Sequence, residues 1–222
     1  MKTTRTPRVK ICCIGSVEEA ALAVECGASA LGLVSQMPSG PGVISEDLIA
    51  EIAATVPPAI GSFLLTSRQN VSEIVAQHRL CRTNCIQLCD RIMSGTYRDL
   101  KGALPGISII QVIHVTGPES VDEAESIAHQ VDAILLDSGN QKLPVKELGG
   151  TGRTHDWSLS RRIRERIGIP MFLAGGLTPE NVGRAIEEVG PYGLDLCSGV
   201  RTNGKLDETR LREFFSAVRN AT

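Results

Sequence analysis

The sequence of 222 residues lacks any apolar run long enough to cross a membrane, and it lacks an excess of charge of one sign. A membrane-spanning helix needs roughly 18 or more consecutive apolar residues. The formal net charge is −2 and the pI is near 6.1, which excludes the broad basic surface of a non-specific nucleic-acid binder. The basic segment 1–8 is followed by a strand-like run containing Lys10 and not by the apolar core of a signal peptide. We therefore expect a cytoplasmic protein with no nucleic-acid or membrane partner.

A disulfide framework is also missing. The seven cysteines are an odd number and are irregularly spaced, whereas disulfide-rich domains are smaller and more regular. Cys81, Cys85 and Cys89 lie close together in the sequence, but their spacing matches neither the usual structural zinc pattern nor the iron–sulfur patterns. We expect reduced thiols that pack as small apolar side chains, and no metal.

The sequence does contain a regular alternation of short apolar runs and amphipathic segments. The apolar runs are rich in β-branched and aliphatic residues and are bounded by Gly, Pro, Ser or Asn, as is typical of strands. They cover residues 8–14, 30–34, 60–66, 85–89, 108–115, 133–138, 170–174 and 193–198. Helical patterns cover 17–26, 45–56, 70–81, 94–103 (the weakest), 120–130, 157–167 and 207–218, and one more begins with Thr178 as N-cap and Pro179 as first residue.

This alternation continues along the chain without a linker or a change in composition, which favours a parallel α/β sheet. The turn after the first strand lacks the G-x-G-x-x-G pattern of a doubly wound dinucleotide-binding sheet. Eight strand–helix units in 222 residues fit a compact barrel. The sequence therefore predicts a single-domain TIM (β/α)8 barrel over residues 1–222.

Polar residues at the strand ends are the candidates for chemistry, because this fold places its active site on the loops that follow the strands. Asp137 ends an apolar strand, where an unpaired carboxylate is costly; a salt bridge to Lys10 or Arg153 is the alternative to a catalytic role. Strand alternation puts Lys10 and Cys12 on one face, and a thiol needs a nearby cation or dipole to be a thiolate near neutral pH. The alternative for Cys12 is a packed thiol without a catalytic role. An acid and a base across one site would suit proton transfer within a substrate.

The loops after the last two strands are rich in glycine. Gly175-Gly176 and Ser198-Gly199 let backbone N–H groups approach an anion, and a helix N-terminus adds its dipole. Each of these glycine-containing segments, taken alone, is explained equally well by a tight turn. Their occurrence in two consecutive final units favours a phosphate site there.

These segments, in this order, resemble the phosphoribosylanthranilate isomerase family of tryptophan biosynthesis over nearly the whole chain. The likeness is carried by residues 9–12, 86–88, 135–137, 149–157, 173–182 and 194–200. The resemblance implies an isomerase that converts N-(5'-phosphoribosyl)anthranilate to 1-(2-carboxyphenylamino)-1-deoxyribulose 5-phosphate by an Amadori rearrangement, with neither cofactor nor metal.

The resemblance also implies roles for individual residues. Asp137 would be the general acid that protonates the ribose ring oxygen and opens the ring. Cys12 would be the general base that removes the proton from C2′ of the resulting iminium. The two final loops would bind the 5′-phosphate, and Lys10, Arg153 and Asp195 are further candidates for substrate binding.

One departure from the family concerns the loop after the second strand. The family has a Ser-Pro-Arg-like segment whose arginine binds the anthranilate carboxylate, and the loop 36–45 contains no arginine. Loss of a charge-assisted contact costs about 1.5–3 kcal/mol, or about one to two orders of magnitude in affinity. Arg68, Arg153 or His155 could replace it.

Other departures are single residues. The family usually has glycine at Cys13, threonine or arginine at Gly15, often histidine at Cys89, and an acid at Arg201.

Two alternative functions follow from these departures: a related isomerase acting on a different sugar phosphate, and a non-catalytic phosphosugar-binding barrel. The presence of both Cys12 and Asp137 counts against the non-catalytic barrel. We expect a small phosphosugar as partner and either a monomer or a homodimer.

Overall fold

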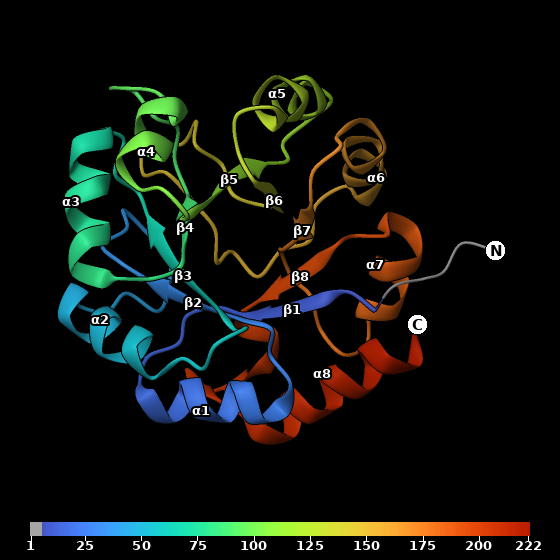
Figure 1. Cartoon of the computed structure of the whole chain (residues 1–222). Helices are drawn as coiled ribbons and strands as arrows, with labels where there is room; N and C mark the ends of the chain where they lie inside the picture. The colour runs from blue at the N-terminus through green and yellow to red at the C-terminus, as the bar shows by residue number, and fades with distance from the viewer. Residues whose placement is uncertain (1–5) are drawn as a thin grey trace.

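Eight parallel strands form one closed barrel surrounded by eight α-helices in the computed structural model, which describes residues 6–222 (Figure 1). Residues 1–5 of the basic N-terminal segment lie outside the described residues. Each strand pairs with the next, and β8 pairs back onto β1 to close the barrel. This confirms the (β/α)8 fold. The strands are β1 (Arg8–Ile11), β2 (Ala30–Val34), β3 (Gly61–Thr66), β4 (Cys85–Leu88), β5 (Ser108–His114), β6 (Ala133–Asp137), β7 (Met171–Leu173) and β8 (Gly193–Leu196).

The first helix begins and ends at the residues that the sequence marks as caps. The Ser16 side chain accepts a hydrogen bond from the backbone N–H of Glu19 at the start of the first helix, and Gly27 ends that helix with a left-handed φ of 112°. In the described chain no helix is both long and apolar enough to span a membrane. The helices are α1 (Val17–Cys26), α2 (Glu46–Thr55), α3 (Val71–Cys81), α4 (Tyr97–Ala103), α5 (Glu119–Ala128), α6 (Trp157–Arg166), α7 (Val182–Val189) and α8 (Glu208–Asn220).

The predicted start of α7 is wrong. Thr178 and Pro179 form a turn before the helix: the Thr178 carbonyl accepts from the N–H groups of Asn181 and Val182, and the Asn181 side chain accepts from the Thr178 N–H at 2.9 Å. The helix therefore begins at Val182, with Asn181 as its cap.

Several predicted strands are also too long. The first strand ends at Ile11, well before residue 14, because Cys13 has a left-handed φ of 61° and turns the chain out of the sheet. The last barrel strand ends at Leu196, where the chain enters a single 3-10 turn (Ser198–Val200). A short hairpin of β9 (Arg201–Thr202) and β10 (Lys205–Leu206), absent from the prediction, follows that turn.

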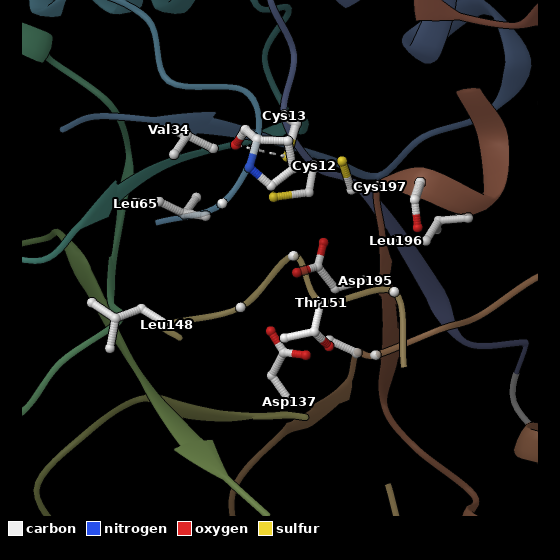
Figure 2. Close-up of a pocket in the computed structure, with 18 of the residues that line it drawn as sticks. Cys12, Cys13, Val34, Leu65, Asp137, Leu148, Thr151, Asp195, Leu196 and Cys197 are labelled. Carbon is white, nitrogen blue, oxygen red and sulfur yellow. Dashed lines mark hydrogen bonds between the residues drawn. The ribbon is translucent and has the colours of Figure 1, made fainter. Parts of the chain in front are cut away.

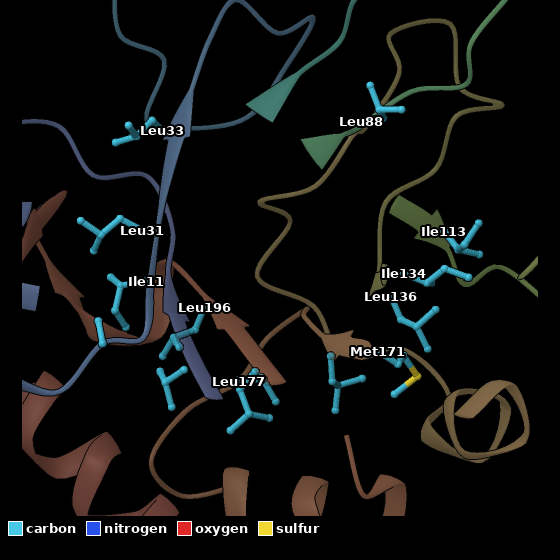
Figure 3. Packing of buried hydrophobic residues seen from close by; sticks show 14 of the residues in the cluster. Ile11, Leu31, Leu33, Leu88, Ile113, Ile134, Leu136, Met171, Leu177 and Leu196 are labelled. Carbon is cyan, nitrogen blue, oxygen red and sulfur yellow. The ribbon is translucent and has the colours of Figure 1, made fainter. Parts of the chain in front are cut away.

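The core has two layers, separated by the barrel wall. Side chains that point outward from the strands, such as Ile11, Leu31 and Leu136, pack against the helices (Figure 3). Side chains that point inward fill the barrel, where Phe63 and Phe172 meet edge to face with ring centroids 6.0 Å apart. Strand alternation therefore sends Lys10 and Cys12 inward on either side of Ile11.

The connection from β6 to α6 ends in a buried tryptophan, the only tryptophan of the chain. Asp156 caps α6, and Trp157 is its first residue, 5% exposed. The guanidinium of Arg184 lies over the indole ring, 4.9 Å from its centre, and this contact fixes the end of the connection against α7.

Candidate active site

A pocket of about 720 Å³, counted with the solvent at its opening, lies at the C-terminal ends of the strands. Cys12 follows β1, Asp137 ends β6 and Asp195 belongs to β8, and all three line the pocket. Loops after β2, β6, β7 and β8 complete its wall. Figure 2 shows Cys12 and Asp137 on opposite sides of the space. The pocket therefore brings the predicted thiol and carboxylate to one cavity.

Asp137 has no cationic partner among the described residues. Its Oδ1 accepts the backbone N–H of Ser138 at 2.7 Å. The two cations considered for it pair elsewhere: Lys10 with Asp195, and Arg153 with Glu147 at 2.5 Å. The alternative of a structural salt bridge to Asp137 is therefore wrong.

The backbone of Gly149 makes room for the other carboxylate oxygen of Asp137. A Cβ atom at Gly149 would lie 2.5 Å from Asp137 Oδ2, and its φ of 129° also favours glycine. Oδ2 therefore faces the loop after β6 without a side chain in the way.

Lys10 lies beneath Cys12 and is fully buried. Its Nζ donates to Asp195 Oδ1 at 2.9 Å. A Cβ atom at Gly32 would lie 2.8 Å from Cys12 Sγ and 2.9 Å from Lys10 Nζ, so these two atoms are less than 6 Å apart. Lys10 does not line the pocket, whereas Asp195 does. The ammonium group thus acts on Cys12 through its charge and does not reach the cavity.

Burial and charge oppose each other at this ion pair. Burial lowers the pKa of Lys10, but the nearby Asp195 carboxylate and Cys12 outweigh it, so that the pKa of Lys10 is raised. Burial raises the pKa of the Asp195 carboxyl more than the Lys10 charge lowers it, so this pKa stays above its ordinary value. Lys10 is consequently a permanent cation below the thiol at neutral pH.

The loops after β7 and β8 present backbone N–H groups to the pocket. Gly175, Gly176 and Ser198 line it, and the two glycines have left-handed φ values of 89° and 61°. Among the described residues, none of these three N–H groups donates to a protein acceptor. Gly199 does not line the pocket; a Cβ there would collide with the Leu177 carbonyl, so this glycine allows the two loops to touch. This wall is suited to an anion.

No Lys, Arg or His side chain is part of the pocket wall in the described chain. The three candidates for the missing arginine are all engaged elsewhere. Arg68 pairs with Glu46 at 3.1 Å, Arg153 with Glu147, and His155 contacts the Ser160 hydroxyl at 2.7 Å. Burial lowers the pKa of His155, so this side chain stays neutral at pH values at which an ordinary histidine is already protonated. The expectation that one of them replaces the arginine gains no support from these contacts.

The loop after β2 closes against the loop after β6. The Ser39 hydroxyl donates to the Lys146 carbonyl at 2.7 Å. A Cβ atom at Gly150, whose φ is 67°, would lie 2.6 Å from Pro41 Cδ. The two loops are therefore in direct contact over the cavity.

Gln87 is a pocket residue to which the sequence assigned no role. Its Oε1 is buried and has no hydrogen-bond partner in the described chain, and the residue lines the cavity. A polar residue within the apolar strand β4 is the signal that points to it. Its free acceptor can take a hydrogen bond from a bound hydroxyl or N–H group.

Comparisons with known proteins agree with this geometry. The family model described as N-(5'phosphoribosyl)anthranilate (PRA) isomerase matches residues 9–217. N-(5'-phosphoribosyl)anthranilate isomerase 2 of Methanosarcina mazei is 37% identical over 215 residues, which are 96% of this chain and 94% of that protein. The corresponding isomerase of Methanocella arvoryzae is 35% identical over 96% of this chain and 98% of its own length.

Solved structures show the same likeness in three dimensions. The crystal structure of phosphoribosyl anthranilate isomerase from Thermotoga maritima superposes with a TM-score of 0.80 at 29% identity, covering 96% of this chain and 99% of that one. A phosphoribosyl anthranilate isomerase in complex with reduced 1-(o-carboxyphenylamino)-1-deoxyribulose 5-phosphate gives a TM-score of 0.78 at 28% identity, with the same coverage.

Proposed function

The chain belongs to the N-(5'-phosphoribosyl)anthranilate isomerase family, and from that premise we propose how its own residues carry out the isomerisation. It is an intramolecular aldose–ketose isomerase of tryptophan biosynthesis. The observation that carries the proposed mechanism is the pair Cys12 and Asp137, which face one cavity from opposite sides.

Asp137 acts as the general acid. It gives a proton to the ring oxygen of the ribose, the C1′–O bond breaks, and the nitrogen stabilises C1′ as an iminium ion. Two features support this role: Oδ2 faces Gly149 of the loop after β6, and no cation in the described chain pairs with the carboxylate. Its hydrogen bond with the Ser138 N–H fixes the orientation of the group.

Cys12 acts as the general base. Its thiolate takes the proton from C2′ of the iminium, which leaves an enolamine that tautomerises to the ketone. The Lys10 ammonium group, less than 6 Å from the sulfur and charged at neutral pH, stabilises the thiolate. Asp195 accepts the hydrogen bond from Lys10 and holds it in place. Asp195 is therefore a positioning residue, whether or not it also touches the substrate.

The substrate is held through its phosphate. Backbone N–H groups of Gly175, Gly176 and Ser198 donate to the 5′-phosphate in the loops after β7 and β8. Their lack of a protein acceptor among the described residues and the left-handed glycines support this role. Gln87 Oε1 offers an acceptor to a ribose hydroxyl or to the bridging N–H group.

A second candidate function keeps the proton chemistry and changes the substrate. The pocket wall of the described chain has no cationic side chain to match a carboxylate, which favours a phosphosugar without an anthranilate carboxyl group. The two candidates are separated by comparing kcat/KM for phosphoribosylanthranilate with kcat/KM for the phosphoribosyl adduct of aniline. A preference for the anthranilate adduct supports the isomerase of tryptophan biosynthesis, and a preference for the aniline adduct supports the second candidate.

The test of the mechanism follows the loss of anthranilate-type fluorescence from freshly generated phosphoribosylanthranilate. Cys12→Ser and Asp137→Asn should each remove nearly all turnover and leave the thermal midpoint close to that of the wild type, since neither change alters side-chain volume much. Cys26→Ser, at a thiol of α1 outside the pocket, is the matched control and should keep its rate. Wild-type rates in Cys12→Ser or Asp137→Asn would refute the assignment.

The partner and the compartment belong to the same proposal. We expect a small phosphosugar as the partner, as in the relative that was solved with a phosphosugar-like compound. The cytoplasmic compartment and the choice between monomer and homodimer stay predictions; one solved structure concerns monomers generated from a dimeric phosphoribosylanthranilate isomerase.

A further inference from the structure

Three thiols lie together on one side of the pocket, where the ends of β1 and β8 are neighbours. Cys12, Cys13 and Cys197 all line the cavity, and Figure 2 shows them close to one another. Among the described residues no group of three His, Cys, Asp or Glu side chains is arranged to hold a metal ion. We therefore consider reactions of the free thiols themselves.

The pairing of the strands brings the cysteines to the same level of the barrel. Ile11 is in register with Leu196, and the Cys12 N–H continues the pairing by donating to the Leu196 carbonyl at 2.8 Å. This pairing places Cys197 beside Cys12 and one residue away from Cys13 at the ends of the two neighbouring strands. A disulfide between Cys13 and Cys197 requires their Cα atoms to approach to about 4.4–6.8 Å.

The Cys13 thiol is the central one of the three. Its Sγ donates to the Pro41 carbonyl at 3.7 Å, and the thiols of Cys12 and Cys197 lie close enough to affect its pKa. The absence of a side chain at Gly42 makes room for it, because a Cβ there would lie 3.0 Å from Cys13 Sγ.

Arg201 supplies the positive charge of this cluster. Its side chain is 10% exposed and is held by Glu19 through two contacts of 2.9 Å, while Nη2 donates to the Cys13 carbonyl at 2.5 Å. Its Nε is buried and has no hydrogen-bond partner in the described chain. The guanidinium is thereby fixed beside the thiols of Cys13 and Cys197.

The two thiols differ in their ability to lose a proton. Interaction with the neighbouring Cys13 thiol and the charge of Arg201 lower the pKa of Cys197 in spite of its burial. Interactions with the thiols of Cys12 and Cys197, together with burial, raise the pKa of Cys13, which keeps its proton. Cys197 is thus the nucleophile of the pair, and Cys13 is the thiol beside it.

We propose that Cys197 and Cys13 form a peroxide-sensitive pair whose disulfide switches the enzyme off. The Cys197 sulfur attacks one peroxide oxygen, the O–O bond breaks, and the departing hydroxide takes a proton to become water, which leaves a sulfenic acid on Cys197. The Cys13 sulfur then attacks the Cys197 sulfur; the S–S bond forms, the S–O bond breaks, and the Cys13 proton leaves with the hydroxide as a second water. The two sulfur atoms together lose two electrons to the peroxide.

The disulfide affects both halves of the site. Cys13 directly follows the proposed base Cys12, and Cys197 directly precedes Ser198 in the proposed phosphate loop. Joining them displaces the thiol of Cys13 from Cys12 and ties the loop after β1 to the loop after β8. A dithiol such as dithiothreitol restores the thiols by exchange and should restore activity.

The experiment treats the reduced full-length chain with hydrogen peroxide and measures free thiols, cross-linked peptides by mass spectrometry, and isomerase activity. We expect two of the seven thiols to disappear, a Cys13–Cys197 peptide, and a loss of activity of roughly tenfold or more that dithiothreitol reverses. Cys197→Ala should keep its ratio of treated to untreated activity near one. Cys26→Ala, the matched control, should respond as the wild type does.

Cys13→Gly provides a second, independent test, because glycine accepts the left-handed backbone of this position. Without the second thiol, Cys197 should oxidise further to a sulfinic acid that dithiothreitol does not reduce. The proposal is overturned if Cys197→Ala is inactivated as fast as the wild type, or if the oxidised sulfur maps to Cys12. The peptide map does not depend on turnover, so it tests the thiol pair even if the proposed function fails.

Discussion

The buried ion pair between Lys10 and Asp195 leads to a prediction that separates stability from catalysis. Lys10→Met keeps most of the side-chain stem and removes the ammonium group, which leaves Asp195 buried without its cation at 2.9 Å. Breaking a buried pair costs about 3–5 kcal/mol. For a chain of this size one kcal/mol corresponds to roughly 2–4 °C in Tm, so the Tm should fall on the order of 6–20 °C.

The double variant Lys10→Met/Asp195→Leu should recover most of this stability, because apolar side chains often replace a buried pair at little cost. Its catalysis should stay impaired. A unit charge less than 6 Å from Cys12 is worth roughly 3 kcal/mol at an effective dielectric constant of 20. Allowing for the opposing charge of Asp195, which is also lost, we expect kcat/KM to fall about ten- to a hundredfold.

Two measurements on the same preparations check this reasoning. Urea unfolding gives the free energy of unfolding of the wild type, both single variants and the double variant, and the fluorescence assay gives kcat/KM. A cost below about 1 kcal/mol for Lys10→Met, or wild-type kcat/KM in the double variant, would refute the role assigned to the pair.

Two further predictions concern residues around the site. Gly32→Ala should reduce kcat/KM at least roughly tenfold, because its Cβ would displace both Cys12 Sγ and Lys10 Nζ; Gly168→Ala, where a Cβ meets no atom within 4 Å, should leave the rate unchanged, and equal rates in the two variants would contradict the packing argument. Since burial lowers the pKa of His155, the wild type should lose stability as the pH falls below about 6.5, by at most about 1.4 kcal/mol per pH unit. His155→Gln should flatten this dependence in urea unfolding at pH 7.5 and pH 5, and an unchanged slope would contradict it.

The architecture could be predicted because it depends on repetition. Eight apolar runs and the helical patterns between them define the barrel whatever their exact ends, and the closed pairing of β8 with β1 confirms it. The strand ends were harder to predict because they depend on single backbone conformations. The left-handed turn at Cys13 is not visible in a run of β-branched and apolar residues.

The site could be predicted only in part. The position of a polar residue within a strand determines the face to which it points, and this placed Cys12 and Asp137 at the mouth of the barrel. Choices between partners depend on distances across the barrel, which the sequence does not contain. Asp195 of β8 pairs with Lys10, so the carboxylate of Asp137 has no cationic partner among the described residues.

The thiol cluster was beyond sequence reasoning for a related reason. Cys13 and Cys197 are 184 positions apart, and only the closure of the barrel makes them neighbours. The charge that acts on them comes from Arg201 at the start of the unpredicted hairpin, held in place by Glu19 of α1. Each of these residues taken alone has an ordinary explanation.

The buried indole of Trp157 gives the molecule an optical reporter of its own. The chain has one tryptophan, so its indole emission comes from a single ring at the end of the connection that carries Gly149 and Thr151 into the pocket wall. Anthranilate groups absorb in the region where indole emits. Resonance energy transfer from Trp157 to a bound ligand would therefore report occupancy of the cavity directly, without a label and independently of turnover.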